Sequence, residues 1–90
     1  MEIIFLLESK HGHIGDVYYD WQCPFVPRIE EGVSIENIFD EGRFVVSEDD
    51  KIESKVDNVE AYVKSLLWKV TGSTWCKKDE YYMLISLLGE

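Results

Sequence analysis

The chain is poor in cysteine and basic residues, and it has no long apolar run. Only Cys23 and Cys76 are present among 90 residues, and without an export signal we expect reduced core thiols rather than a disulfide. The apolar run Ile3–Leu7 follows no basic segment and is too short for a signal sequence or a membrane span. We therefore expect a cytoplasmic protein with no membrane contact.

Motifs for catalysis or cofactor binding are also missing. The six glycines form neither a phosphate-binding loop nor a dinucleotide fingerprint, and no serine lies in a nucleophile elbow. Carboxylate pairs such as Glu30-Glu31 and Asp49-Asp50 fall in polar runs, where acids are usually exposed and ionised. The sequence therefore predicts a non-enzymatic protein without a cofactor.

The apolar residues that are present are numerous enough for a folded domain. The chain is 46% hydrophobic and 13% aromatic despite a net charge of −9, and such a composition is too apolar for disorder. Ninety residues correspond to one small domain that buries roughly 60–65% of its unfolded surface. We expect a single domain over residues 1–90.

Acidic residues concentrate in the middle of the chain. Between Arg28 and Glu60 there are eleven acidic residues against four basic ones, a local net charge of −7. A field of this sign repels nucleic acid and attracts a basic protein. A solvated face that only keeps the protein soluble is the simpler interpretation of the same residues.

The first third of the chain alternates strand and loop signals. Five large apolar residues make Ile3–Leu7 a buried strand, and the glycine-containing segment Ser9–Asp16 is expected to be a loop. Val17–Gln22 has apolar residues at every second position, which is typical of a half-buried strand. The prolines restrict Cys23–Arg28 to an extended connector or a sheet edge.

The middle third predicts a second pair of strands. Val33–Ile38 and Arg43–Ser47 both favour short strands, and the turn residues Asp40-Glu41-Gly42 between them indicate a hairpin. After the charged segment that follows, Ile52 and Val56 are four residues apart, as on one face of a short helical turn.

The last third predicts a second hairpin. Tyr62–Val70 and Glu80–Leu88 are apolar runs joined by the polar segment Thr71–Asp79, and the second run is apolar on both faces, as in a central strand. The alternative for the first run is a helix near residues 58–70, because Asp57 and Glu60 resemble an N-terminal capping box. We favour the strand for its β-branched and aromatic residues.

These elements predict a mainly β fold, a small curled sheet or barrel of five to six strands that can include one short helix. The alternative is an α+β fold with a helix near residues 58–70. Closure into a barrel removes exposed edges. The chain resembles small uncharacterised bacterial barrel proteins of SH3-like topology, which implies a fold and no activity. The residues that carry this resemblance are Trp21, Pro24, Val26–Ile29, Gly32-Val33, Gly42–Val46, Tyr62-Val63, Trp68 and Tyr81–Leu87.

Two histidines form the one cluster with metal-ligand chemistry. His11 and His13 are two residues apart with Asp16 nearby, so both imidazoles can point the same way from an extended segment. No third or fourth ligand accompanies them in a recognisable spacing, and a solvated loop explains them equally well. A small metal-dependent enzyme, or a nucleophile made from Cys23 and a histidine, is therefore the weaker alternative.

Aromatic and acidic residues together indicate protein binding. Small barrels commonly bind basic or proline-containing peptides through an aromatic patch rimmed by acids, so we expect a protein–protein interaction module with a basic partner or an identical subunit at a sheet edge. An acidic inhibitor or immunity-type protein that blocks a basic site, and a component of a phage or secretion assembly, are the alternatives. Trp75 is the strongest single candidate, although it can equally plug the barrel end. The expected binding residues are Tyr18, Tyr19, Trp21, Trp75, Glu48, Asp49 and Asp50.

Overall fold

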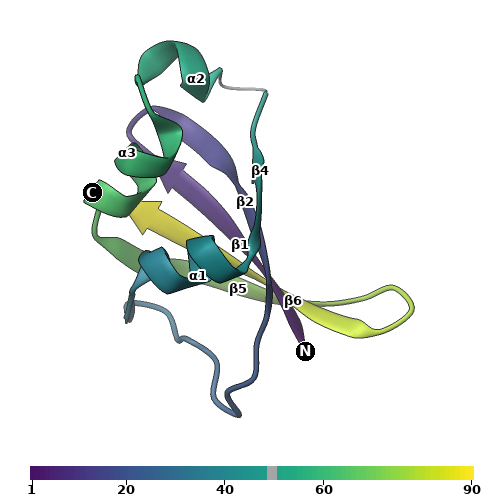
Figure 1. Ribbon diagram of the computed structural model, residues 1–90. Helices are drawn as coiled ribbons and strands as arrows, with labels where there is room; N and C mark the ends of the chain where they lie inside the picture. The colour runs from purple at the N-terminus through teal and green to yellow at the C-terminus, as the bar shows by residue number, and fades with distance from the viewer. Residues whose placement is uncertain (49–50) are drawn as a thin grey trace.

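The protein folds as a curled, half-barrel sheet of six strands with short helices against one side of it (Figure 1). The computed structural model describes residues 1–48 and 51–90. The strands lie in the order β3-β5-β6-β1-β2-β4, which confirms the predicted mainly β curled sheet of five to six strands. The elements are β1 (Glu2–Ser9), β2 (Gly12–Asp20), β3 (Gly32–Val33), α1 (Ile35–Glu41), β4 (Arg43–Val46), α2 (Ile52–Lys55), α3 (Val59–Ser65), β5 (Trp68–Lys77) and β6 (Tyr81–Gly89).

Strands β1 and β2 form a tight antiparallel hairpin. Ser9 pairs with Gly12 across the turn, and Gly12 has a positive φ of 96°. The predicted loop over Ser9–Asp16 is therefore wrong, because β2 already begins at Gly12. Gly15 does not mark a loop: it is buried where an added Cβ would lie 2.4 Å from the backbone oxygen of Val45. Its lack of a side chain lets β4 approach β2 closely.

The centre of the sheet is a parallel pair, β1 and β6. Their register runs from Glu2 opposite Tyr82 to Glu8 opposite Leu88. Strand β6 also pairs antiparallel with β5 and so lies between two strands. The predicted strand over Ile3–Leu7 and the predicted central strand at the end of the chain are both confirmed.

The segment before β5 is helical, so the predicted strand over Tyr62–Val70 is wrong in its first half. Helix α3 is capped by Asn58, whose side chain accepts a hydrogen bond of 3.0 Å from the backbone N–H of Ala61. The alternative helix near residues 58–70 is thus correct up to Ser65, with its cap one residue after the expected Asp57. Val63 at the buried face decides the outcome, because helical spacing carries it into the core.

Helix α1 replaces most of the predicted strand over Val33–Ile38, of which Val33 alone lies in a strand, β3. Ile35 and Ile38 are both buried, and a spacing of three residues puts both on one helix face but on opposite faces of a strand. The predicted turn at Asp40-Glu41-Gly42 is the end of this helix, where the Gly42 N–H donates to the carbonyl of Ile38. Strand β4 is present as predicted, but it pairs with β2 rather than forming a hairpin.

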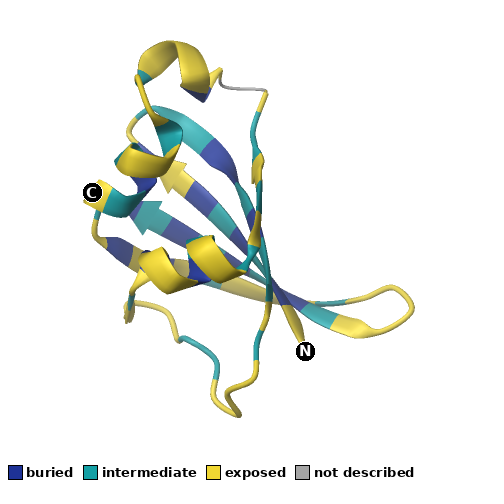
Figure 2. Ribbon diagram, viewed as in Figure 1, coloured by how far each residue is buried: buried dark blue, intermediate teal, exposed yellow. Residues whose placement is uncertain are grey.

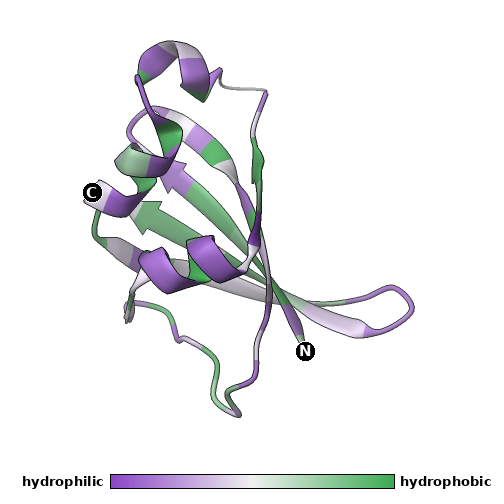
Figure 3. Cartoon of the chain, viewed as in Figure 1, coloured by the Kyte–Doolittle hydropathy of each residue, from purple (hydrophilic) through white to green (hydrophobic). Residues whose placement is uncertain are grey.

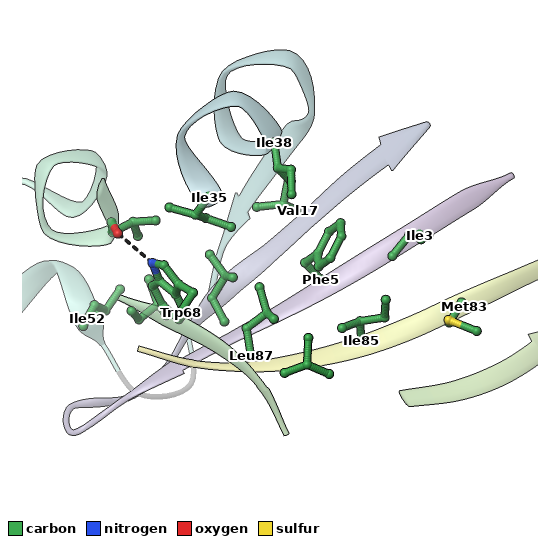
Figure 4. Packing of buried hydrophobic residues seen from close by; sticks show 14 residues of the cluster. Ile3, Phe5, Val17, Ile35, Ile38, Ile52, Trp68, Met83, Ile85 and Leu87 are labelled. Carbon is green, nitrogen blue, oxygen red and sulfur yellow. Dashed lines mark hydrogen bonds between the residues drawn. The ribbon is translucent and has the colours of Figure 1, made fainter. Parts of the chain in front are cut away.

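The hydrophobic core lies between the sheet and the helices. Figure 2 shows buried residues along the strands behind the helices, and Figure 4 shows side chains from strands and helices meeting there. Ile35 and Ile38 of α1, Ile52 of α2 and Val63 of α3 all join this cluster. The Trp68 indole is 3% exposed and its Nε1 donates a 2.8 Å hydrogen bond to the Val63 carbonyl, which ties β5 to α3.

Candidate interaction surface

The sheet has two faces that differ in what covers them. Side chains alternate between the faces of a strand, and in β1 Ile3, Phe5 and Leu7 point into the core. Ile4 and Leu6 therefore point to the opposite face. The same alternation operates in β6, and Figure 3 shows that β1 and β6 are both strongly hydrophobic along the middle of the sheet. Both central strands thus carry apolar side chains on both faces.

The strand register aligns residues of the opposite face in rows across the sheet. Tyr18 pairs with Ile4 and Ile4 with Leu84, while Arg43 and Thr74 complete this row on β4 and β5. Neighbouring rows extend the apolar surface along the strands. We call this surface the open face, and its apolar side chains are Ile4, Leu6, Tyr18, Val45, Tyr82, Leu84 and Leu88.

Among the residues that the structure describes, no helix packs on the open face. The buried side chains of all three described helices belong to the core cluster. None of the seven apolar side chains of the open face belongs to that cluster or packs against it. Strands that are apolar on both sides are typical of sheets covered on both sides. Within the described chain, the open face therefore lacks a second layer.

Carboxylates surround the apolar part of the open face. Glu2 and Asp20 are paired across β1 and β2 at one end, and Glu8 lies at the other end of β1. Asp16 stands between them, opposite Leu6, with a side chain that is 28% exposed. The open face is therefore an apolar surface with an acidic rim.

Arg43 and Lys69 are the basic residues that β4 and β5 place on this face, and both are engaged. The Arg43 guanidinium carbon lies 4.3 Å from the centre of the Tyr18 ring, a cation–π arrangement. The Lys69 Nζ lies 3.6 Å from a carboxylate oxygen of Glu30. The Arg43 contact shows that the Tyr18 ring presents a face that a guanidinium can occupy.

A hollow of about 570 Å³ opens at the Glu2 end of the open face. Tyr18, Ile4 and Tyr82 line it from the strands, and Lys78–Tyr81 line it from the turn between β5 and β6. Its charged lining residues are Glu2, Asp79 and Glu80 on the acidic side, against Lys78 and the amine of Met1. Acids are therefore in excess beside the tyrosine rings, and such a site can receive a lysine or arginine side chain. We call this hollow the tyrosine hollow.

Tyr82 shares the open face with Cys76, which lies opposite it on β5. Cys76, through its charge and then through a hydrogen bond, raises the pKa of the Tyr82 hydroxyl above its ordinary value. Both cysteines are free. The predicted core location of their thiols is wrong, however, because Cys23 is exposed and Cys76 is only partly buried.

Of the predicted binding aromatics, Tyr18 lies on the open face, whereas Tyr19 and Trp21 lie on the core side. The Trp21 ring packs 6.1 Å from Phe5 and its Nε1 donates to the Phe25 carbonyl at 3.0 Å. The Tyr19 hydroxyl donates to Glu41 at 2.8 Å, and this hydrogen bond is the largest cause of the raised pKa of Tyr19. Tyr19 and Trp21 thus help to anchor the elements that cover the core.

Trp75 lies in strand β5 and not in a polar connection, since β5 extends to Lys77. It pairs with Met83, whose side chain is in the core, yet the Trp75 side chain is 58% exposed. The Trp75 indole is accessible, and its role as a binding residue stays a prediction. It does not share a face with Tyr18, so the structure separates these two predicted binding residues.

Of the three predicted acidic residues, Glu48 is described by the structure, and it lies beyond the strands that form the open face. Glu48 is exposed just after β4, and it lies at the opposite end of the β2–β4 pairing from Tyr18. Asp49 and Asp50 lie outside the described residues. The acids that border the open face are in β1 and β2, and the one sequence signal that pointed there was the apolar character of both faces of the central strands.

The two histidines point to different partners. The His13 Nε2 lies 2.7 Å from Asp16 Oδ1 and 3.1 Å from the Gly15 carbonyl oxygen. The His11 ring packs 5.7 Å from the ring of Tyr62. Across the described parts of the chain, no group of three or more His, Cys, Asp or Glu residues has an arrangement that would hold a metal ion.

No family model, curated protein or solved structure matches this chain. The resemblance to SH3-like barrel proteins therefore stays a prediction. Over residues 1–48 and 51–90, none of the helices combines the length and apolar character needed to cross a bilayer.

Proposed function

We propose that this protein is a non-catalytic interaction module that binds a basic protein partner on the open face. One observation carries the proposal. Strands β1 and β6 have apolar side chains on both faces of the sheet, but the described helices cover only one of these faces. Removing such a surface from water is favourable by about 25 cal/mol per Å². A partner that supplies the second layer gains this free energy on binding.

The acidic rim determines the charge of the partner. Glu2, Glu8, Asp16 and Asp20 outnumber the strand residues Arg43 and Lys69, and the whole chain carries a net charge of −9. Of these acids, Asp16 contacts His13 and Asp20 contacts the Met1 amine, whereas Glu2 and Glu8 form no ion pair among the described residues. A second copy would bring acids against acids, and an anionic membrane surface would repel the rim. A protein with an apolar surface bordered by lysine or arginine complements both features.

The tyrosine hollow gives this partner a specific contact. An arginine or lysine inserted beside Tyr18 and Tyr82 would meet aromatic rings on its flanks and the Glu2 carboxylate at its charged end. Buried contacts of this kind commonly carry most of the binding energy of an interface. We therefore assign the anchor position of the partner to a basic side chain in this hollow.

The test is affinity capture from the source lysate at low salt, followed by elution in a salt gradient and identification of the eluted proteins. We expect a specific partner whose retention falls with salt and is lost in Glu2→Lys/Asp20→Lys. The control Glu36→Lys/Glu53→Lys makes the same change in net charge on the helix side and should retain the partner. Equal loss in both double variants would show that only net charge matters and would contradict the proposal.

The apolar contribution needs its own variant. Leu6→Ser removes an apolar side chain from the open face and should release the partner even at low salt. Phe25→Ser removes an aromatic side chain that is 75% exposed outside the open face and should leave capture unchanged. The identity of the captured protein then separates a module from an inhibitor of a basic enzyme or an assembly component.

A further inference from the structure

Among the residues that the structure describes, none pairs with the outer edge of β5 over most of its length. Strand β3 pairs with β5 only at Lys69 and Trp68, and two backbone hydrogen bonds with Glu30 and Glu31 extend this pairing to Val70. From Thr71 to Lys77, no described residue pairs with the outer side of β5. Figure 1 shows the β5–β6 hairpin projecting beyond the rest of the sheet. We call this stretch the free edge.

The free edge lacks most of the devices that keep edges from pairing. It contains no proline, its one charged residue is Lys77 at one end, and its one irregularity is at the other end, between Val70 and Gly72. Its outer backbone N–H and C=O groups form a template for another strand. The indole of Trp75 lies beside that template and is 58% exposed.

We propose that two copies of this chain pair antiparallel along their free edges, so that their sheets join across a two-fold axis at Thr74. A two-fold axis relates the two β5 strands, and each residue then pairs with a residue of the other copy whose side chain points to the same face of the joined sheet. Thr74 is the midpoint of Thr71–Lys77, so this register uses the whole free edge. A register centred on Ser73 would push Lys77 against Lys69, where β3 already occupies the edge.

Charge complementarity favours a second copy as the occupant. Lys77 of each copy would lie opposite Thr71 of the other, and Lys78 would follow it. The edge position just beyond Thr71 is occupied by Glu30 and Glu31, which bond to Val70. The lysines of each copy would therefore meet the glutamates of the other at both ends of the joined strands.

Like charges stay apart in this arrangement. No acidic residue occurs between Glu60 and Asp79, whereas the chain as a whole carries −9. The two Lys77 residues are offset by six strand positions, or about 20 Å at strand spacing. That separation exceeds the Debye length of about 10 Å at 0.1 M ionic strength. Repulsion is therefore smaller at this edge than at the acid-rimmed open face.

The indoles complete the interface. In the Thr74-centred register, Trp75 faces Ser73 of the other copy and lies diagonal to the other Trp75. Diagonal neighbours on one face of an antiparallel pair are about 7–8 Å apart, within reach of aromatic side chains. Two half-exposed indoles would thus cover each other on the core side of the joined sheet. The open face lies on the other side and stays free for the partner proposed above.

The test is site-specific disulfide cross-linking in a Cys23→Ser/Cys76→Ser background. Thr74→Cys should give a covalent dimer under mild oxidation, because the two Thr74 positions are directly opposite. Ser73→Cys, one position along, should stay mainly monomeric, because its counterpart is Trp75. Equal cross-linking of both variants, or of neither, would overturn the proposed register.

Sedimentation of the native chain tests the association itself. We expect a concentration-dependent dimer that weakens in Lys77→Glu/Lys78→Glu but not in the charge-matched control Lys10→Glu/Lys51→Glu. Trp75→Ser should also weaken it, with unchanged circular dichroism. A native chain that stays monomeric at all concentrations would overturn the proposal, and so would equal weakening in both charge variants.

Discussion

The two faces of the sheet come from the same strands but have different surroundings. In β1, Phe5 and Leu7 are fully buried under the helices, whereas Leu6 between them is only partly buried on the open face. The residue types on the two faces are alike, so hydrophobicity alone does not distinguish a core residue from a residue of the open face. What distinguishes the faces is whether the described chain covers them, and the uncovered face is where we propose that a partner binds.

Adjacent leucines give the largest contrast between the faces. Leu7→Ala removes a side chain with 0% exposure and should lower the free energy of unfolding by about 2–5 kcal/mol. Leu6→Ala should cost about 1 kcal/mol or less, because its side chain is not part of the core. Urea unfolding of both variants measures the difference. Equal losses would show that the open face is as important to stability as the core.

Two glycines offer a second contrast, within the strands. An added Cβ at Gly15 would lie 2.4 Å from the Val45 backbone oxygen and 2.7 Å from the Phe44 ring, so Gly15→Ala should destabilise by about 1–3 kcal/mol. At Gly72 the nearest atoms are those of Ser86 at 4.0 Å. Gly72→Ala should therefore leave the melting temperature almost unchanged. A large loss of thermal stability in this variant would contradict the open space around Gly72 in β5.

The helix cap gives a smaller effect on the covered side. Asn58→Ala removes the side-chain acceptor for the Ala61 N–H and should cost about 1 kcal/mol. Asp57→Ala, at the cap position expected from the sequence, should change the free energy of unfolding by less than about 0.5 kcal/mol. A larger loss in Asp57→Ala than in Asn58→Ala, measured by chemical denaturation, would show that Asp57 caps the helix instead.

The smallest expected effect is a loss of stability at alkaline pH. The hydrogen bond that the Tyr19 hydroxyl donates to Glu41 is the main cause of the raised pKa of Tyr19. Tyr19 is protonated in both states below pH 10, and above it the unfolded tyrosine ionises first, so stability falls as pH rises through the folded pKa. The stability of Tyr19→Phe should fall less steeply between pH 9 and 11. Parallel curves for the two proteins would argue against this contact.

Local sequence pattern predicted the sheet well and the helices unevenly. The helical turn expected at Ile52 is present as α2, whereas α1 was missed. The run Ile3–Leu7 and the doubly apolar final strand were identifiable because length and alternation define strands directly. The segment around Tyr62 and Val63 was misassigned because β-branched and aromatic residues favour strands, while core packing of Val63 favours the helix. The pairing of β4 with β2 depends on a non-local contact that no local pattern records.

The surface expected from the sequence and the open face share Tyr18, but they differ in their acidic residues. An aromatic surface with acids was expected, and Tyr18 belongs to one. Its acids Glu2 and Asp20 were missed because they join Tyr82 only through the non-local register of β1 with β2 and β6. The dense acidic run after Arg28 drew attention instead, because charge density is visible in a sequence and strand register is not.

The most direct test is side-chain footprinting of the captured complex against the free protein, with oxidative labelling read by mass spectrometry. The account predicts strong protection of Tyr18, Tyr82 and Leu84 on partner binding, with Phe25 and Ile29 labelled equally in both samples. Protection confined to Phe25, Ile29 or the helix surfaces, with Tyr18 and Tyr82 unchanged, would contradict the assignment of the open face as the binding surface.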